Sequence, residues 1–474
     1  MKLIYNIDAK PKQIGYLKTI LFAFQQLLAI MAATIAVPSI INGNIINLGY
    51  ELNMSMAAAL FGAGIGTLVY QLFTKFKSPV FLGSSFAFIG SMTAAFSGAV
   101  SSGILFETLG YLGLVLGAIL AGLVYVILSL VVKFVGVNWI NKLMPPVVIG
   151  PTVALIGLSL AGAAVKDVFS YGPQDGNGAY IMSTGAWASM ICAIVTLFVV
   201  ILCSTYGKKI GKLFPFIIGI LSGYAVALVF TAIGYATSNP ALMVIDFAPF
   251  KALVADGITL KTFFSVPEFT FLKALNGTQN FEWSYLATIA VAYIPVAFVV
   301  FAEHIADHKN LSSIIEKDLL EEPGLHRTLL GDGVGSIAGA IFGGCPNTTY
   351  GESVGCVAIT KNASVATITV TAVMAIVISF ISPFVAFLDS IPGCVMGGVC
   401  ITLYGFIAVS GLKMIQKIDL EKNANLFTTA VILITGIGGM SLAIGKVTLT
   451  TTACSLILGI ITNILVNLKK TDTE

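Results

Sequence analysis

The chain has 474 residues, of which 57% are hydrophobic and only 10% are charged. Its mean hydropathy of +0.96 excludes a soluble globular domain and indicates a protein that crosses the bilayer many times. The net charge of +3 comes without a clustered basic face, so we expect no nucleic acid partner.

Apolar runs of about 20 residues recur in chain order from residue 16 onward, and each is long enough as a helix to cross a bilayer core. Their polarity does not alternate as the strands of a membrane barrel would require. We count about fourteen such segments, two of them irregular. The predicted fold class is therefore an all-α polytopic membrane protein.

The basic residues predict the orientation of these segments. If residues 1–15 form an uncleaved cytoplasmic N-terminus, every second boundary should be basic. The boundaries that fit are marked by Lys75, Lys77, Lys133, Lys142, Lys208, Lys209, Lys212, Lys309, Lys317, Arg327, Lys361, Lys413, Lys417, Lys422, Lys469 and Lys470. We therefore expect residues 469–474 to be a cytoplasmic C-terminus.

Residues 237–283 contain no apolar span and fall on the opposite side, so we expect an extracellular loop there. The loop is rich in aromatic residues. Two interpretations stay open, a packed extracellular cap and a disordered loop with interfacial aromatic side chains.

Two pairs of segments resemble each other across the chain. Ser78-Pro-Val-Phe-Leu-Gly-Ser-Ser-Phe-Ala-Phe88 and residues 345–358 each place Pro, then Gly, then small polar residues inside a membrane-length segment. The sequences that begin at Met144 and Ile391 also correspond. Seven segments followed by seven more would enter the membrane in opposite senses, which predicts the inverted repeat of a secondary transporter.

The two Pro- and Gly-interrupted segments are the best pointer to a binding site. An acidic side chain at the bilayer centre costs about 2.5 to 3.5 kcal/mol, so Glu352 indicates a cavity rather than a lipid-facing surface. Interrupted helices offer free N–H groups to a ligand at Gly83 to Phe86 and at Tyr350 to Glu352. The alternative is that the small residues only allow close helix packing.

Further acidic residues end the apolar run 284–302. Glu303 and Asp307 stand four residues apart and share one helical face, so both can line one cavity. Glu303 could instead mark a solvated helix end. A third interpretation is metal, because His304, Asp307 and His308 have the outline of an inverted zinc-peptidase motif, which keeps an intramembrane metallohydrolase as the enzyme alternative.

Several short motifs with polar residues in this sequence resemble motifs of the nucleobase/ascorbate transporter family, in particular of its bacterial uracil permeases. The resemblance runs from about Gln25 to Gly411. The motifs are Gly83-Ser-Ser-Phe-Ala-Phe88, Ala302-Glu-His-Ile305, Lys317-Asp-Leu-Leu320, Pro323-Gly-Leu-His-Arg327 and Pro346-Asn-Thr-Thr-Tyr-Gly-Glu352.

Three positions depart from the family pattern. Ser353 replaces the Asn of the family signature, which Glu352, Gly355, Thr360 and Lys361 otherwise meet. Gln26 stands where the family usually has His. Asp307 occupies the position of a His in uracil permeases, whereas some purine-transporting relatives carry Asp there.

The resemblance implies a fold of two domains with about fourteen segments. The core would comprise residues 16–133 and 284–388, and the gate residues 138–236 and 392–468, within a single transporter unit at 16–468. Short strands in the third and tenth segments would run antiparallel at the site. The gate would also form a homodimer.

The resemblance also implies the site residues. Glu303 and Glu352 would hold a nucleobase, and backbone N–H groups near Phe86 and Gly351 would meet its carbonyl groups. Tyr404 would approach from the gate, and Tyr350 directly precedes the site. Phe86 and Tyr404 could equally be ordinary core aromatic residues.

The resulting hypothesis is nucleobase uptake across a bacterial inner membrane, with uracil as substrate and Glu303 and Asp307 as proton-coupling groups. Sodium coupling and a xanthine or other purine substrate remain alternatives. We expect no cofactor, no metal and no enzymatic activity.

Overall fold

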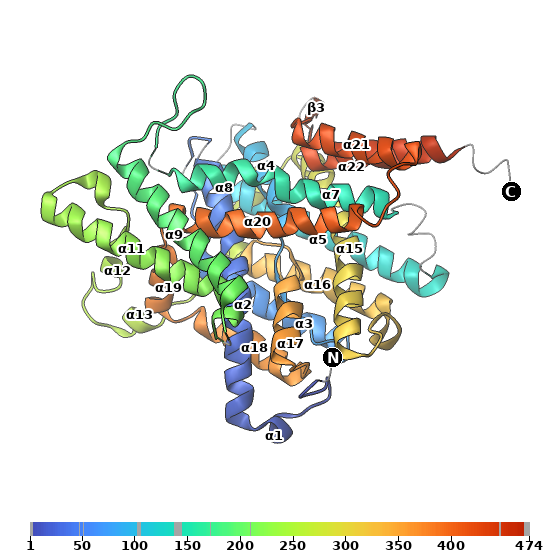
Figure 1. Cartoon of the computed structure of the whole chain (residues 1–474), viewed down its shortest axis with the longest axis horizontal. Helices are drawn as coiled ribbons and strands as arrows, with labels where there is room; N and C mark the ends of the chain where they lie inside the picture. The colour runs from blue at the N-terminus through green and yellow to red at the C-terminus, as the bar shows by residue number, and fades with distance from the viewer. Residues whose placement is uncertain are drawn as a thin grey trace.

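The computed structural model describes residues 3–46, 48–50, 52–101, 106–136, 145–170, 172–208, 210–444 and 447–468. Lys142, Met144, Lys209 and residues 469–474 belong to predictions made above and lie outside these described ranges. Within the ranges the chain is mostly helical, as its composition predicts, and Figure 1 shows its helices gathered into one bundle.

In the described ranges, eight helical segments are long and apolar enough to cross a membrane. They are α2 (Tyr16–Ile46), α3 (Met56–Phe73), α5 (Phe106–Val135), α7 (Pro146–Ser159) with α8 (Ala161–Val168), α9 (Thr184–Tyr206), α11 (Pro215–Thr237), α15 (Trp283–Ile315) and α20 (Gly393–Ile415). Shorter helices complete the bundle: α4 (Ile89–Ser101), α16 (Leu325–Gly343), α17 (Gly351–Thr360), α18 (Val365–Ile378), α19 (Ser382–Asp389), α21 (Asn423–Ile437) and α22 (Thr451–Asn467). The chain is therefore a multi-pass membrane protein.

The two irregular segments each contain a short strand followed by a helix. Strand β1 (Leu82–Ser84) leads into the short helix η1 (Phe86–Phe88) and then α4, and β2 (Asn347–Thr349) leads into α17. The strands pair antiparallel, with Gly83 opposite Thr348. The predicted antiparallel strands in these two segments are confirmed.

The strand pair is stable inside an apolar bundle because neighbouring groups form hydrogen bonds with the strand residues at its outer edges. The Thr67 hydroxyl accepts a hydrogen bond from the Leu82 N–H at 2.9 Å and lies 3.2 Å from the Leu82 carbonyl. On the other strand, the Asn347 amide donates to the Gly62 carbonyl at 3.0 Å. Extended backbone is tolerated at membrane depth only where protein groups meet its polar atoms in this way.

Glycines allow α3 and α16 to approach closely on either side of Asn347. A β-carbon added to Gly62 would lie 2.4 Å from the Gly339 carbonyl oxygen, and one added to Gly339 would lie 2.1 Å from the Asn347 amide nitrogen. Small residues at such positions let helix backbones pack directly against each other. Asn347, in the Pro-Asn-Thr-Thr-Tyr-Gly-Glu motif, thus has a structural role between α3 and α16.

The helices pack in two groups. Helices α2 to α5 pack with α15, α16 and α18, whereas α7 to α9 and α11 pack with α20, and α21 and α22 pack with each other and with α7. Figure 1 shows α7, α8 and α20 running side by side across the bundle, with α16, α17 and α18 below them. The strand pair belongs to the first group.

Residues 237–283 are ordered, so the disordered-loop alternative is wrong. The segment holds η2 (Pro240–Leu242), α12 (Ala248–Ala252), α13 (Leu260–Phe263), α14 (Thr270–Gly277) and η3 (Thr278–Asn280). Phe269 stacks on Phe271 and packs against Phe61 of α3 and Phe342 of α16. Helix α14 also packs along α5, where Lys273 lies 3.4 Å from Glu107. The segment therefore covers one end of the first helix group.

Short elements complete the connections. They are α1 (Pro11–Ile14), α10 (Ile210–Leu213), η4 (Leu320–Gly324) and the antiparallel strands β3 (Leu442–Ile444) and β4 (Val447–Leu449), which the sequence analysis did not predict. The N-terminal segment lies against the end of α17, where Tyr5 pairs with Asn362 and the Ser364 hydroxyl donates to the Ala9 carbonyl at 2.6 Å.

The contact between α3 and α16 gives a direct test. Gly62→Ala should destabilise the fold by about 1 to 3 kcal/mol, because the added methyl meets backbone that cannot rotate away. Thermal unfolding of purified protein in detergent measures the loss. Gly90→Ala in α4 is the matched control, since no atom lies within 4 Å of its added methyl. Equal melting temperatures for the two variants would contradict the packing argument.

Candidate functional site

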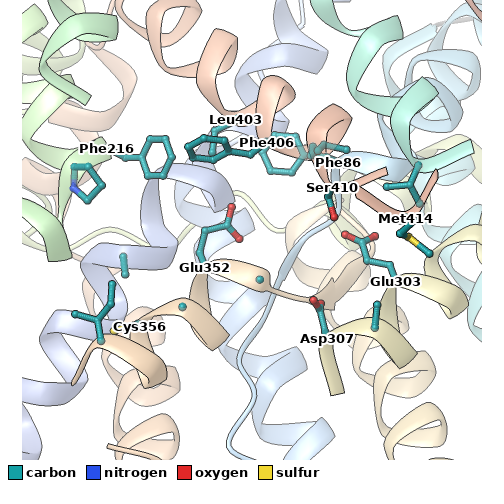
Figure 2. Close-up of a pocket in the computed structure, with 18 of the residues that line it drawn as sticks. Phe86, Phe216, Glu303, Asp307, Glu352, Cys356, Leu403, Phe406, Ser410 and Met414 are labelled. Carbon is teal, nitrogen blue, oxygen red and sulfur yellow. The ribbon is translucent and has the colours of Figure 1, made fainter. Parts of the chain in front are cut away.

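A cavity of about 440 Å³ lies between the two helix groups. Figure 2 shows the carboxylates of Glu303 and Glu352 pointing into it, opposite Phe406 and Ser410 of α20. Its lining residues are Ala29, Phe86, Val153, Lys212, Pro215, Phe216, Glu303, Ala306, Asp307, Gly351, Glu352, Gly355, Cys356, Ile359, Leu403, Phe406, Ile407, Ser410 and Met414. A smaller cavity of about 60 Å³ shares Phe86, Glu303, Gly351 and Glu352 and extends toward Thr348, Thr349 and Tyr350.

Glu303 and Asp307 reach the large cavity from α15, as their spacing predicts. The Thr349 hydroxyl at the end of β2 donates to Asp307 Oδ2 at 2.8 Å. The other oxygen, Oδ1, lies 4.0 Å from the point where a β-carbon on Gly351 would stand. Asp307 is thus held against the start of α17, and Glu303 lies one turn away without an interruption of the helix.

The beginning of α17 brings Gly351 and Glu352 to the same cavity. Tyr350 is the N-cap residue, and within the described chain its side chain makes no capping bond to the first turn. The free N–H groups and the helix dipole at an N-terminus favour a ligand acceptor atom. Ser85 precedes η1 in the same uncapped way, so the N-terminus beside Phe86 offers a second set of donors.

Tyr350 lies across β1 and fixes the junction between strand and helix. Its hydroxyl donates to the Ser84 carbonyl at 2.7 Å. A β-carbon on Gly83 would stand 2.3 Å from the Tyr350 ring, so only glycine leaves room for the ring. The side chain lines the smaller cavity and not the larger one.

Phe86 and Tyr404 meet at the boundary between the helix groups. Their rings lie 6.1 Å apart in an edge-to-face arrangement. Phe86 lines both cavities, whereas Tyr404 is buried behind it and lines neither. In this conformation Tyr404 supports the Phe86 wall.

Two of the three departures from the family pattern contact each other. Gln26 Nε2 donates to the Ser353 hydroxyl oxygen at 2.6 Å, and the same oxygen accepts from the Phe81 N–H at 3.3 Å. Both side chains are buried. Gln26 and Ser353 therefore form a matched pair that ties α2 to the residue following Glu352.

His304 and His308 point away from the cavity, whereas Asp307 points toward it. The three residues of the zinc-peptidase outline therefore do not converge on one point. His304 Nδ1 bonds to Asp332 Oδ2 at 2.8 Å, and His308 Nε2 bonds to the Tyr70 hydroxyl at 2.7 Å. Asp307 lies on the other side of α15 against Thr349. Within the described ranges no group of three His, Cys, Asp or Glu residues is arranged to hold a metal ion.

The wall that α11 and α20 contribute was not predicted from the sequence. Phe216, Phe406, Ser410 and Met414 line the cavity, together with Lys212. Pro215, Gly405, Gly411 and Lys413 stand directly beside the four uncharged residues, but these neighbours form no pattern that distinguishes a cavity wall from an ordinary helix. They line the site because the tertiary structure places α11 and α20 across the cavity from the acidic residues of α15 and α17.

The arrangement suits a small, flat and polar ligand. Two carboxylates accept hydrogen bonds, two helix N-termini donate them, and the remaining lining is largely apolar. A multi-pass membrane protein with broken helices that meet at such a cavity belongs, by fold and site, to the class of membrane transporters.

Comparison with known proteins identifies the family. A model described as a permease family matches residues 17–445. The uracil permease of Bacillus subtilis (strain 168) is 37% identical over 449 residues, covering 94% of this chain and 91% of that relative. The uracil permease of Escherichia coli (strain K12) is 34% identical over 446 residues, covering 94% and 90%. The chain belongs to this permease family, the nucleobase/ascorbate transporters, and is a transporter rather than an enzyme.

Solved structures share the fold at low sequence identity. The transmembrane domain of the cyanobacterium bicarbonate transporter BicA aligns with a TM-score of 0.61 at 15% identity, covering 98% of this chain and 99% of that one. The murine anion transporter Slc26a9 in its inward-facing state aligns with a TM-score of 0.63 at 13% identity, covering 96% and 68%. These likenesses concern the fold alone.

The Gln26 and Ser353 pair can be tested by a double-mutant cycle. Gln26→Ala and Ser353→Ala should each destabilise the protein by about 1 to 3 kcal/mol. The first removes the 2.6 Å bond to the buried Ser353 hydroxyl, and the second removes the acceptor shared by Gln26 Nε2 and the Phe81 N–H. The double variant should lose clearly less than the sum, with a coupling of about 0.5 to 3 kcal/mol. Additive losses in thermal unfolding would contradict the pairing.

Proposed function

We propose that this protein takes up uracil in symport with protons. The observation that carries the proposal is that Glu303 and Glu352 face one cavity together with the uncapped start of α17. Relatives named uracil permeases at 34% and 37% identity over nearly the whole chain support uracil as the substrate.

The chemistry of the base suits these groups. A pyrimidine-2,4-dione offers ring N–H donors to the carboxylates of Glu303 and Glu352. Its carbonyl oxygens would accept from the backbone N–H groups near Phe86 and Gly351, where two helices begin without side-chain caps in the described chain. Phe86 provides an apolar face for the ring, and Tyr350 holds the junction beside it.

We propose the architecture of an inverted repeat of seven plus seven segments. The core would hold residues 16–133 and 284–388, and the gate residues 138–236 and 392–468, in line with the two packing groups. The residues 1–15 and 469–474 would be cytoplasmic and 237–283 extracellular, following the distribution of basic residues. Two copies would associate through their gates in the bacterial inner membrane.

Transport would proceed by movement of the core against the gate. The cavity continues to Lys212, Ile359 and Met414, which stand beside the basic boundaries expected in the cytoplasm. On that assignment the present conformation opens inward. Tyr404 would come nearer to the base when the gate shifts relative to Phe86.

Glu303 and Asp307 would carry the coupled proton. Two carboxyl groups one helical turn apart in a protein interior are more stable when they share a proton than when both are charged. Asp307 already accepts a bond from Thr349, so its charge is partly compensated and Glu303 is the better proton acceptor during transport.

A purine such as xanthine is the second candidate substrate, because Asp307 stands where uracil permeases carry His. Competition decides between them. Uptake of labelled uracil should fall with excess unlabelled uracil and stay nearly unchanged with excess xanthine. Stronger inhibition by xanthine would assign the protein to purines.

Glu303→Gln should abolish concentrative uptake, because the amide cannot carry a proton. The measurement is accumulation of labelled uracil by a permease-deficient host, with and without a protonophore. Wild-type accumulation should collapse with the protonophore. Normal proton-driven accumulation by the variant would refute the role of Glu303.

Glu352→Ala should weaken equilibrium binding of uracil in detergent by about 2 kcal/mol or more, the typical cost of losing a charged hydrogen-bond partner. Glu321→Ala is the matched control, since Glu321 is exposed on η4 and lies outside the cavity. Equal affinities for the two variants would remove Glu352 from the site.

A further inference from the structure

A buried polar cluster lies behind the substrate cavity, on the opposite face of α15. His304 and Asp332 are bonded at 2.8 Å, and their side chains are 0% and 1% exposed. The His308 ring stacks on the His304 ring at 4.0 Å. The uptake mechanism proposed above uses none of these three groups.

The hydrogen-bond partners of both histidines are compatible with neutral rings. His308 Nδ1 faces the His304 carbonyl oxygen at 2.8 Å, and because a carbonyl only accepts, Nδ1 carries the hydrogen. His308 Nε2 then accepts from the Tyr70 hydroxyl at 2.7 Å, so His308 is satisfied as a neutral ring. His304 Nδ1 faces Asp332 Oδ2 at 2.8 Å, and Nε2 faces the Thr328 hydroxyl at 3.0 Å. That hydroxyl also lies 3.0 Å from the Leu325 carbonyl oxygen, and His304 is satisfied as a neutral ring when the hydroxyl donates to Nε2.

One oxygen of Asp332 remains without a partner. Asp332 Oδ1 and the Tyr125 hydroxyl are both buried, and neither has a hydrogen-bond partner in the described part of the chain. Both residues line a cavity of about 10 Å³ with Ser336, Asn347 and Thr348. That volume accommodates about one water molecule. Oδ1 can therefore either accept from this side or, when protonated, donate toward it.

The surroundings provide no permanent countercharge. In the described ranges no Lys or Arg pairs with Asp332, and its hydrogen-bond partner His304 carries a charge only when both ring nitrogens are protonated. Of the other ionisable groups around α16, Glu303 and Asp307 on α15 are acidic, and Tyr125 on α5 and Tyr70 on α3 are neutral. Lys273 on α14 pairs with Glu268, and Glu322 on η4 pairs with Lys317. A proton is thus the charge that balances Asp332.

The small cavity beside Asp332 and Tyr125 is connected to the substrate site through strand β2. Thr348 lies in β2 opposite Gly83, and the next residue, Thr349, holds Asp307. A change on Asp332 that moves β2 therefore reaches both the broken segments and the carboxyl group beside the ligand. Asp332 is also within electrostatic reach of Glu303 and Asp307.

We propose that Asp332 is a second proton-binding group of this transporter, with Oδ1 as the protonated atom and His304 as the residue that positions it. The proposal rests on proton-coupled transport. Protonation of Oδ1 leaves the hydrogen bond between His304 and Oδ2 intact, because His304 donates to Oδ2 in both the charged and the protonated form of Asp332. The Tyr125 hydroxyl, directly or through one water molecule, donates to the charged form and accepts from the protonated one.

Asp332→Asn tests the proposal in proteoliposomes that contain the full chain. The amide imitates the protonated acid, so uracil binding and uracil counterflow should stay within about threefold of wild type. Accumulation driven by a pH gradient should fall by roughly tenfold, as expected for the loss of coupling between sites. The pH dependence of binding should also flatten.

Two results would overturn the proposal. One is normal gradient-driven accumulation with an unchanged pH dependence. The other is an equal loss of binding, counterflow and accumulation at every pH, which would show a structural role only. If wild-type protein fails to bind uracil, the proposed function is wrong, and the spectroscopic test below still decides the role of Asp332.

Infrared difference spectroscopy across a pH step covers the case in which Asp332→Asn does not fold. Tyr125→Phe should shift the frequency of a protonated carboxyl band, because it removes the hydroxyl that shares the small cavity with Asp332 and that we propose bonds to Oδ1 directly or through one water molecule. Tyr111→Phe is the matched control on the same helix, since the Tyr111 hydroxyl bonds to the Asn53 carbonyl instead. Identical carboxyl bands in both variants and wild type would refute protonation at Asp332.

Discussion

The antiparallel pairing of β1 with β2 is the constraint on which the rest of this structure depends. Backbone at membrane depth must find hydrogen-bond partners inside the protein, and two strands from distant segments supply most of them to each other. Thr67 and Asn347 complete the edges, and the glycines of α3 and α16 make room for Asn347. As a result, two helices begin beside one cavity, and within the described chain neither has a side-chain cap.

Helix α15 places acidic side chains on one face and histidine side chains on another. Glu303 and Asp307 face the cavity, while His304 and His308 face the interior of the first helix group and bond to Asp332 and Tyr70. The polar interior cluster and the ligand cavity are therefore two sides of one rigid helix. Strand β2 contacts both sides, since Thr349 bonds to Asp307 and Thr348 lines the Asp332 cavity.

Much of the fold and of the site could be predicted from local signals. The interruptions by Pro and Gly predicted two broken segments at the site, and the spacing of Glu303 and Asp307 placed both carboxyl groups on one face. The antiparallel pairing of the strands was expected only from the family resemblance. Local signals could not show that Gln26 and Ser353 compensate each other, because 327 positions separate them. The family resemblance expects Tyr404 to approach the ligand from the gate, and in this conformation its ring packs behind Phe86.

The sequence by itself determined a multi-pass helical protein with two broken segments and buried acids, because hydropathy and the cost of charge in lipid are local properties of the chain. Tertiary structure decided which face of α15 the histidines occupy, which residues of α11 and α20 form the opposite wall, and that Asp332 meets His304. These outcomes depend on how helices far apart in the chain pack together. The sequence of an apolar membrane helix does not show which face packs against another helix, because lipid-facing and helix-facing side chains are similarly hydrophobic.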